Sequence, residues 1–170
     1  MYPETTMNFD VQAQLTAADR SMSFLDRDGQ PAAAISLSRV FDTTLLDLWD
    51  AVTSARRIPL WAMPITGDLK LGGRYQLEGN AGGTIETCDY LNHIGLTWEF
   101  GEDTSWVDFR FTHSRGDRAR LTLTHASILS EFWDTYGPGA AGVGWEMGFL
   151  GLALYTSDHN FEDPDPEEFA

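Results

Sequence analysis

An apolar segment near the C-terminus, residues 143–155, sets the strongest limit on how this chain can fold. Its large apolar side chains recur at three- and four-residue spacing, which predicts a long α-helix with a broad apolar face. Such a helix needs partners that cover most of its surface. Gly144, Gly148 and Gly151 lie near one side of it, and each costs up to about 1 kcal/mol of helix stability relative to alanine. We therefore expect a strand or another helix to pack closely against that side.

The region before this helix, residues 67–128, alternates between short β-rich runs and turn signals such as Gly72-Gly73. Short connections at regular spacing predict a meander of antiparallel strands. The β-rich runs are residues 74–77, 84–90, 94–100, 106–112 and 120–126.

One more strand and a short helix precede this meander. Residues 35–41 alternate apolar and polar side chains for most of their length, as a half-buried strand does. Thr43 and Thr44 can cap a helix, and apolar residues recur on one face of residues 45–52. Residues 55–58 can add a further turn. The order predicts an α+β fold, in which a curved antiparallel β-sheet wraps around the long C-terminal helix, with short helices after the first strand.

The charge balance argues against some classes of partner. Lys and Arg number 11 against 26 Asp and Glu, so the net charge is −15, which disfavours nucleic acids and acidic membrane surfaces. No apolar run reaches about 18 residues, and the N-terminus lacks the basic start and apolar stretch of a secretory signal. We expect no membrane insertion and a cytoplasmic location.

The length of 170 residues suits a single folded domain with one core. We assign residues 1–32 to an N-terminal extension, residues 33–158 to the folded domain and residues 159–170 to an acidic tail. Like charges and prolines predict that this tail is unordered. Cys88 is the only cysteine, so no intramolecular disulfide forms, and we expect its thiol to be buried and inert.

This order of elements, together with particular residues, resembles the SRPBCC (START-like, helix-grip) superfamily and, within it, the heat-shock-protein-90 ATPase activator homologue family. The resemblance covers about residues 33–157, and seven motifs occur in the family's order. They are Leu37-Ser38-Arg39-Val40-Phe41-Asp42 with Leu48-Trp49-Asp50-Ala51-Val52-Thr53, Trp61, Gly72-Gly73-Arg74-Tyr75, Gly83-Thr84-Ile85-Glu86, Leu96-Thr97-Trp98, Arg120-Leu121-Thr122-Leu123-Thr124-His125, and Gly144-Trp145 with residues 150–155.

The resemblance implies an elongated apolar cavity between the sheet and the last helix. It does not imply one reaction, because the superfamily includes lipid carriers, hormone receptors, cyclases and co-chaperone domains. Our first interpretation is a carrier, sensor or sequestering protein for a small apolar or aromatic molecule. The alternatives are an enzyme of the polyketide cyclase or aromatase type and a stress-related co-chaperone domain. Whether the chain is an enzyme stays open, with a non-catalytic role favoured, and a homodimer and a chaperone partner stay open as well.

Aromatic residues dominate the candidate ligand site. Core packing is the simpler expectation for Trp49 and Trp98. Trp61 lies in a Pro-bounded loop at the expected cavity mouth, and Trp145 begins the last helix. Aromatic walls with few polar groups suit a hydrophobic or ring-bearing ligand. The candidate residues are Trp61, Tyr75, Trp98, Trp106, Phe109, Trp145, Met147 and Phe149.

The histidines do not predict a metal site. A hairpin turn at Arg115-Gly116-Asp117 would place His113 opposite Ala119, about three pair positions along the hairpin from His125. The two imidazoles would then be too far apart to chelate one ion. We predict no metal and no cofactor.

No catalytic residue is predicted either. The same turn places Asp108 opposite Thr124, and Asp108 and Glu86 could act as acid and base only if they were buried together. On half-buried strands we expect them on the solvent face. The glycine-rich residues 79–83 and 137–144 lack the strand-to-helix setting and the lysine of phosphate-binding loops. We interpret them as flexible turns near the cavity mouth that could act as a lid.

Overall fold

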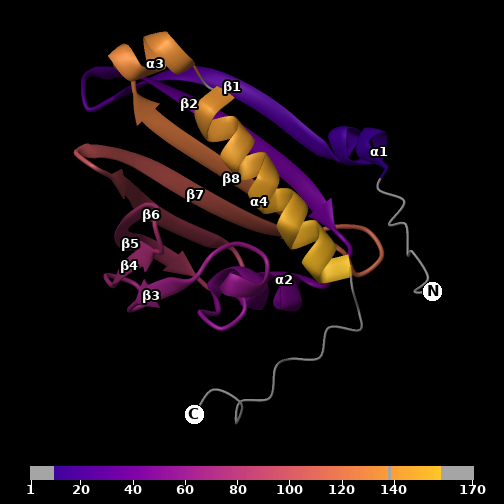
Figure 1. Cartoon of the computed structure of the whole chain (residues 1–170). Helices are drawn as coiled ribbons and strands as arrows, with labels where there is room; N and C mark the ends of the chain where they lie inside the picture. The colour runs from indigo at the N-terminus through magenta and orange to yellow at the C-terminus, as the bar shows by residue number, and fades with distance from the viewer. Residues whose placement is uncertain (1–9, 138, 158–170) are drawn as a thin grey trace, which may run out of the picture.

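The computed structural model describes residues 10–137 and 139–157, which form one curved sheet with helices packed against it (Figure 1). The sheet has eight strands in the order β1-β2-β8-β7-β6-β5-β4-β3, and all neighbouring strands are antiparallel. The strands are β1 (Ala18–Arg27), β2 (Gln30–Phe41), β3 (Ile65–Gly67), β4 (Arg74–Leu77), β5 (Gly82–Asp89), β6 (His93–Phe100), β7 (Asp103–His113) and β8 (Ala119–Ile128).

One long helix, α4, crosses the face of this sheet, and shorter helices lie around it (Figure 1). The expected α+β helix-grip fold is confirmed. In the described part of the chain, no helix is long and apolar enough to cross a membrane. The helices are α1 (Val11–Thr16), α2 (Leu45–Thr53), the 3-10 helix η1 (Ile58–Leu60), α3 (Glu131–Tyr136) and α4 (Gly139–Ser157).

Both expected helices form, but only the first begins where the sequence predicts. α2 begins after Thr44, whose side chain accepts a hydrogen bond from the backbone N–H of Asp47 at 3.2 Å, as its capping pattern predicts. α4 begins at Gly139, earlier than the expected residue 143. The glycine-rich residues 139–144 are therefore helical turns, and the expectation of a flexible turn there is wrong.

The register of the last hairpin agrees with the sequence prediction. Asp108 lies opposite Thr124, and His113 lies opposite Ala119. The turn between β7 and β8 thus sets the pairing of both strands, as expected for a short connection.

The N-terminal segment contributes more to the sheet than the sequence indicates. β1 lies within the stretch assigned to an extension, yet it pairs with β2 along its whole length. Asp28 and Gly29 join the two strands with positive φ angles of 53° and 80°, as a two-residue hairpin turn requires. Most residues of β1 are exposed, so no apolar alternation marks it in the sequence. The acidic tail of residues 159–170 lies outside the described residues.

A close approach fixes the C-terminal half of α4. A Cβ atom added to Gly151 would lie 2.5 Å from the carbonyl oxygen of Trp61. At this position a side chain is excluded, and the expected close packing against a glycine of α4 is confirmed.

Candidate ligand-binding cavity

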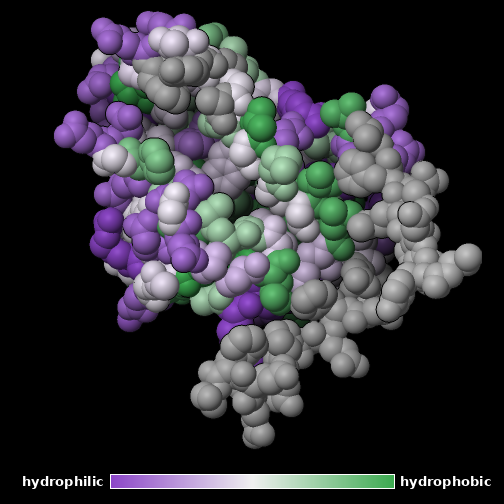
Figure 2. Space-filling view, viewed as in Figure 1, coloured by the Kyte–Doolittle hydropathy of each residue, from purple (hydrophilic) through white to green (hydrophobic). Residues whose placement is uncertain are grey.

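A cavity of about 950 Å³ lies between α4 and the sheet, and its wall is mostly apolar. In Figure 2, hydrophobic side chains gather on the face of the molecule that carries α4. The volume is near the upper end of the usual range for ligand pockets. The sheet contributes Tyr75, Ile85, Ile94, Leu96, Trp98, Phe109, Leu121 and His125, and α4 contributes Gly144, Trp145, Met147, Gly148, Phe149 and Leu152.

Strand alternation explains which sheet residues reach this cavity. On β6, Ile94, Leu96 and Trp98 line it, and each is two residues from the next. Successive side chains of a strand point to opposite faces of a sheet. The glycine and threonine between them, Gly95 and Thr97, therefore belong to the other face.

Cys88 reaches the cavity through a β-bulge. Ile85 lies opposite Leu96 on the neighbouring strand. The register shifts before Thr87, which places Cys88 opposite Ile94. The thiol is exposed and lines the cavity, so the expectation of a buried cysteine is wrong.

Two glycines of α4 make room in the cavity. No heavy atom lies within 4 Å of the place where a Cβ atom of Gly144 or Gly148 would be, and both residues line the cavity. The expectation of close packing is wrong for these two positions. Their missing side chains leave space that a larger residue would fill.

Aromatic rings form one wall of the cavity. Trp98 of β6 and Trp145 of α4 have ring centroids 4.9 Å apart, with an angle of 53° between their planes. Phe109 of β7 meets Trp145 edge-on at 6.0 Å and 81°. These distances are typical of attractive aromatic pairs. The contacts join the helix to the sheet at the same place where they offer ring surfaces to a ligand.

A short chain of hydrogen bonds holds this wall. The indole Nε1 of Trp145 donates to Nδ1 of His125 at 2.9 Å. A neutral imidazole that accepts at Nδ1 carries its proton on Nε2, so Nε2 donates to Oγ of Ser105 at 2.7 Å. The Ser105 hydroxyl then donates to the carbonyl oxygen of Trp98 at 3.2 Å. Both nitrogens of His125 are used within the protein.

Burial keeps His125 uncharged. Its residue is 8% exposed, and desolvation lowers the pKa of the imidazole from 6.5 to about 4. At neutral pH the side chain is therefore a neutral link between α4 and β7, with a fixed tautomer.

The hydroxyl of Tyr75 is also used in a hydrogen bond within the protein. Its hydroxyl donates to the carbonyl oxygen of Thr97 at 2.6 Å. Burial, together with the nearby Glu99 carboxylate, raises the pKa of this phenol above its ordinary value. Thr53, Lys70, Asn80 and Tyr90 are further polar side chains that line the cavity.

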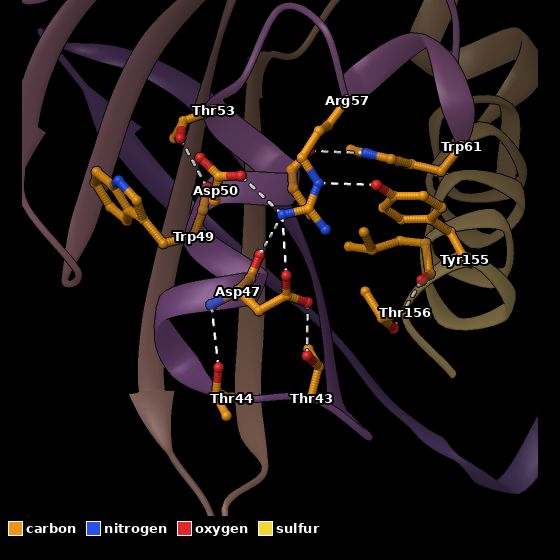
Figure 3. Close-up of polar contacts among 12 residues, drawn as sticks. Thr43, Thr44, Asp47, Trp49, Asp50, Thr53, Arg57, Trp61, Tyr155 and Thr156 are labelled. Carbon is orange, nitrogen blue, oxygen red and sulfur yellow. Dashed lines mark hydrogen bonds and ion pairs between the residues drawn. The ribbon is translucent and has the colours of Figure 1, made fainter. Parts of the chain in front are cut away.

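A polar cluster around Arg57 joins α2 to α4 (Figure 3). Its guanidinium donates to the Tyr155 hydroxyl of α4 and to the Asp50 carboxylate, both at 2.8 Å, and it pairs with Asp47 at 3.0 Å. Although burial lowers the pKa of Arg57, the hydrogen bonds to Asp50 and Tyr155 raise it above its usual value. The indole of Trp61 donates to the carbonyl oxygen of Ala51 at 2.9 Å. α2, the loop after it and α4 are thereby held together.

The structure brings most of the candidate residues together. Trp106 is the exception, because it shares a face of β7 with Asp108, away from Phe109, and the guanidinium of Arg27 lies 3.6 Å from its ring centroid. Met147 is 66% exposed, which places it at the mouth. The residues that line the cavity are Trp61, Tyr75, Trp98, Phe109, Trp145, Met147 and Phe149.

The sequence analysis missed His125 and Ser105 at this site. His125 follows Leu121 and Leu123 at two-residue spacing on β8, where Leu121 lines the cavity and Leu123 lies in the buried core. This spacing was the available signal, since alternate residues of one strand share a face. Ser105 carries no comparable signal, because its contact depends on how β7 pairs with β6.

The two carboxylates considered as an acid–base pair, and His113, lie outside the cavity. Glu86 is exposed, and Asp108 is bound by the His93 imidazole at 2.5 Å. His113 is exposed at the end of β7. Among the described residues, no three side chains of His, Cys, Asp or Glu are grouped so that they could hold a metal ion.

The comparisons with known proteins agree with this geometry. CalU16 from Micromonospora echinospora is 29% identical, with a TM-score of 0.71 over 84% of this chain and 87% of that chain. An HSP90 activator from Plasmodium falciparum, PFC0360w, is 22% identical, with a TM-score of 0.60 over 69% of this chain and 90% of that chain. Protein MLL2253 from Mesorhizobium loti is 18% identical, with a TM-score of 0.67 over 75% of this chain and 99% of that chain. The latter two show the fold alone.

The family assignment comes from the sequence of the same region. None of the curated proteins matches this chain significantly. The model of one family does match, over residues 42–155, which run from just before α2 to the last turn of α4. The chain therefore belongs to the family of activator of Hsp90 ATPase homolog 1-like proteins.

Proposed function

We propose that this protein binds one small apolar, ring-bearing molecule in the cavity between α4 and the sheet, as a carrier, sensor or sequestering protein. The observation that carries the proposal is the cavity itself, with about 950 Å³ of space inside a mostly apolar wall. Water in such a space finds few hydrogen-bond partners, so an apolar ligand displaces it with a favourable free energy.

The wall favours a ligand with flat rings. Trp98, Phe109 and Trp145 are held in place by one another and by the hydrogen bond from Trp145 to His125. Rigid rings lose little conformational entropy when a ligand packs against them. Ring stacking would add to the burial of apolar surface.

The engaged polar groups favour binding over catalysis. A cyclase or aromatase needs a side chain that moves protons at the ligand. His125 uses both ring nitrogens, and the Tyr75 hydroxyl already donates to a carbonyl oxygen. The cyclase interpretation is therefore the alternative. A co-chaperone role, suggested by the similarity to the HSP90 activator from Plasmodium falciparum, would use an exposed face and is ranked third.

Native mass spectrometry of the purified protein, followed by denaturing extraction, tests the proposal. We expect a stoichiometric apolar adduct, or, for the empty protein, binding to members of a panel of polycyclic aromatic compounds and lipids. Prolonged incubation of the complex distinguishes the alternative, because a cyclase would change the mass or the absorption spectrum of the extracted molecule. An empty protein that binds no member of the panel would contradict the proposal.

Matched glycine substitutions localise the binding. G148L places a side chain into the cavity, where no atom lies within 4 Å of the added Cβ, and should weaken binding at least about tenfold. G142L is the control, since Gly142 is on the same helix but lines a separate, smaller hollow. Equal binding by both variants would show that the ligand lies elsewhere.

A further inference from the structure

We propose that the ion pair of Arg20 with Glu146 controls how fast a ligand passes the cavity mouth, because it fixes the first half of α4, residues 139–148. The inference rests on the proposed function, since it concerns access to the same cavity. This ion pair, the strap, joins β1 to α4. Neither residue lines the cavity, so the strap acts on a ligand through the position of α4 and without touching it.

The cavity mouth at Met147 lies between the first half of α4 and one end of the sheet. On the helix side, Gly144 and Met147 line the cavity and are exposed, and on the sheet side Asn80 and Phe100 do the same. The first residue of β5 pairs with the residue before Phe100, which places the turn that holds Asn80 beside the end of β6. Trp98, near this end of β6, packs against α4. A ligand that enters between these two sides passes the first half of α4.

The two halves of α4 are held to the protein differently. In the second half, Phe149 and Leu152 are buried, and Gly151 lies against the carbonyl oxygen of Trp61. In residues 139–148 no described side chain is buried, and four of these residues are glycines, which lower helix stability. Few buried contacts are typical of segments that open locally. The first half is therefore the part of α4 that can move at the mouth while the second half stays fixed.

The strap has a fixed geometry. Nε and Nη2 of Arg20 donate to the two carboxylate oxygens of Glu146, the second of them at 2.9 Å. Nη1 of Arg20 donates to the carbonyl oxygens of Leu15 and Ala18, each at 2.9 Å. Because backbone carbonyls already orient the guanidinium, less side-chain entropy is lost when the pair forms. The two-bond contact is therefore stronger than an ordinary exposed ion pair.

Little else holds the first half of α4 on the side of β1. A hollow of about 320 Å³ lies between β1, β2 and α4, and Arg20, Trp145 and Glu146 are among the residues that line it. The strap thus spans a space that side chains do not fill. On the cavity side, Trp145 bonds to His125 and packs on Trp98. Breaking the strap leaves these contacts of one side chain to position the first half.

Stopped-flow fluorescence with Nile red, an uncharged polycyclic dye, measures entry and exit in the full-length protein. E146Q should raise the association and dissociation rate constants about threefold each, the effect of a well-formed ion pair. The dissociation constant should stay nearly the same, because the dye contacts neither residue of the strap. D19N is the matched control, since Asp19 is on the same strand and pairs with Arg120 of β8 at 3.3 Å. Its rates should equal those of the wild type.

Sodium chloride gives a second readout, which a general loss of stability would not reproduce. The side chains of Arg20 and Glu146 are 41% and 37% exposed, so salt screens their attraction. Between about 0.01 M and about 1 M sodium chloride, the dye rates of the wild type and of D19N should rise. The rates of E146Q should change less, because its strap is already broken.

Hydrogen exchange of the empty protein tests the strap without a ligand. E146Q should speed exchange in residues 139–148 about threefold relative to residues 149–157, and D19N should not. Unchanged exchange in E146Q overturns the proposal even where the dye binds. Faster exchange with unchanged dye rates overturns it too, since the ligand then enters elsewhere. A protein that binds no dye contradicts the proposed function and, with it, the control of ligand entry, whereas faster exchange in E146Q would still show that the strap fixes α4.

Discussion

His125 links α4 to the sheet through a bond that exists only while its imidazole is neutral. Its Nδ1 accepts the indole proton of Trp145, and its Nε2 donates to Ser105. A second proton on the ring would have to sit on Nδ1, where it would face the N–H of Trp145. Protonation therefore breaks the link and also places a charge in a buried site.

This gives a prediction for the stability at acidic pH. The pKa of His125 is about 4 in the folded protein and 6.5 ordinarily, so between these values the unfolded chain binds the proton more readily. The stabilisation is complete above about pH 6.5 and is lost as the pH falls towards 4. Urea unfolding at pH 7 and pH 4 should show a loss of about 3 kcal/mol from this one group.

The control for this prediction is H125Q. A glutamine amide can accept from Trp145 and donate to Ser105 but does not titrate in this range. H125Q should lose about 3 kcal/mol less than the wild type between the two pH values. Equal losses in the two proteins would mean that His125 does not cause the acid sensitivity.

Residue patterns predicted much of the cavity wall. The alternation of side chains along β7 could have corrected one error, the choice of Trp106 as a cavity residue. Trp106 and Phe109 are three residues apart on one strand, so they cannot both face the cavity. Phe109 shares its face with the buried Val107 and Phe111. Trp106, on the other face, was a candidate only because it is aromatic.

At the scale of whole elements, α4 has two kinds of glycine. Gly151 lies against the carbonyl oxygen of Trp61, whereas Gly148 faces the empty cavity. The spacing of glycines predicted close packing on one side of the helix, and it could not tell contact from open space. That distinction depends on the loop after α2, whose path is set by the Arg57 cluster and by the hydrogen bond of Trp61 to Ala51.

Alanine substitutions at these two glycines should have opposite effects. G151A forces a methyl group to within 2.5 Å of the Trp61 oxygen and should lower the free energy of unfolding by about 1–3 kcal/mol. G148A meets no atom within 4 Å and should raise it by up to about 1 kcal/mol, because alanine favours the helix. Urea unfolding of both variants measures the difference. A loss at both positions would indicate that α4 packs closely along its whole length.

The strands show the limit of prediction for elements. The runs of the meander were predicted because each has a buried face, and β4 has the expected bounds of residues 74–77. β1 was missed because both of its faces are largely exposed. Asp28-Gly29 is a common hairpin turn and was the one signal for it. The bulge in β5 has no such signal, because it arises from how two strands pair.

At the scale of the whole molecule, the cavity couples the sheet to the helix. The core residues Leu121, Phe149 and Leu152 belong to both the packed interior and the cavity wall. A ligand in this space adds contacts between elements that are distant in sequence. Binding at a hundred times the dissociation constant stabilises the folded chain by about 2.7 kcal/mol. This stabilisation should be strongest for the segments of the wall that face the empty cavity and would gain contacts with the ligand.

Hydrogen exchange with and without ligand tests this distribution. The turn at residues 79–83 includes the cavity-lining Asn80, and the first turns of α4 include the cavity-lining Ala141 and Gly144. A ligand that contacts these two segments should slow their exchange more than that of the β1–β2 hairpin. The hairpin is the internal control, because β1 and β2 contribute nothing to the cavity wall among the described residues. Equal slowing in all three segments would mean that the ligand stabilises the molecule globally and that neither segment acts as a lid.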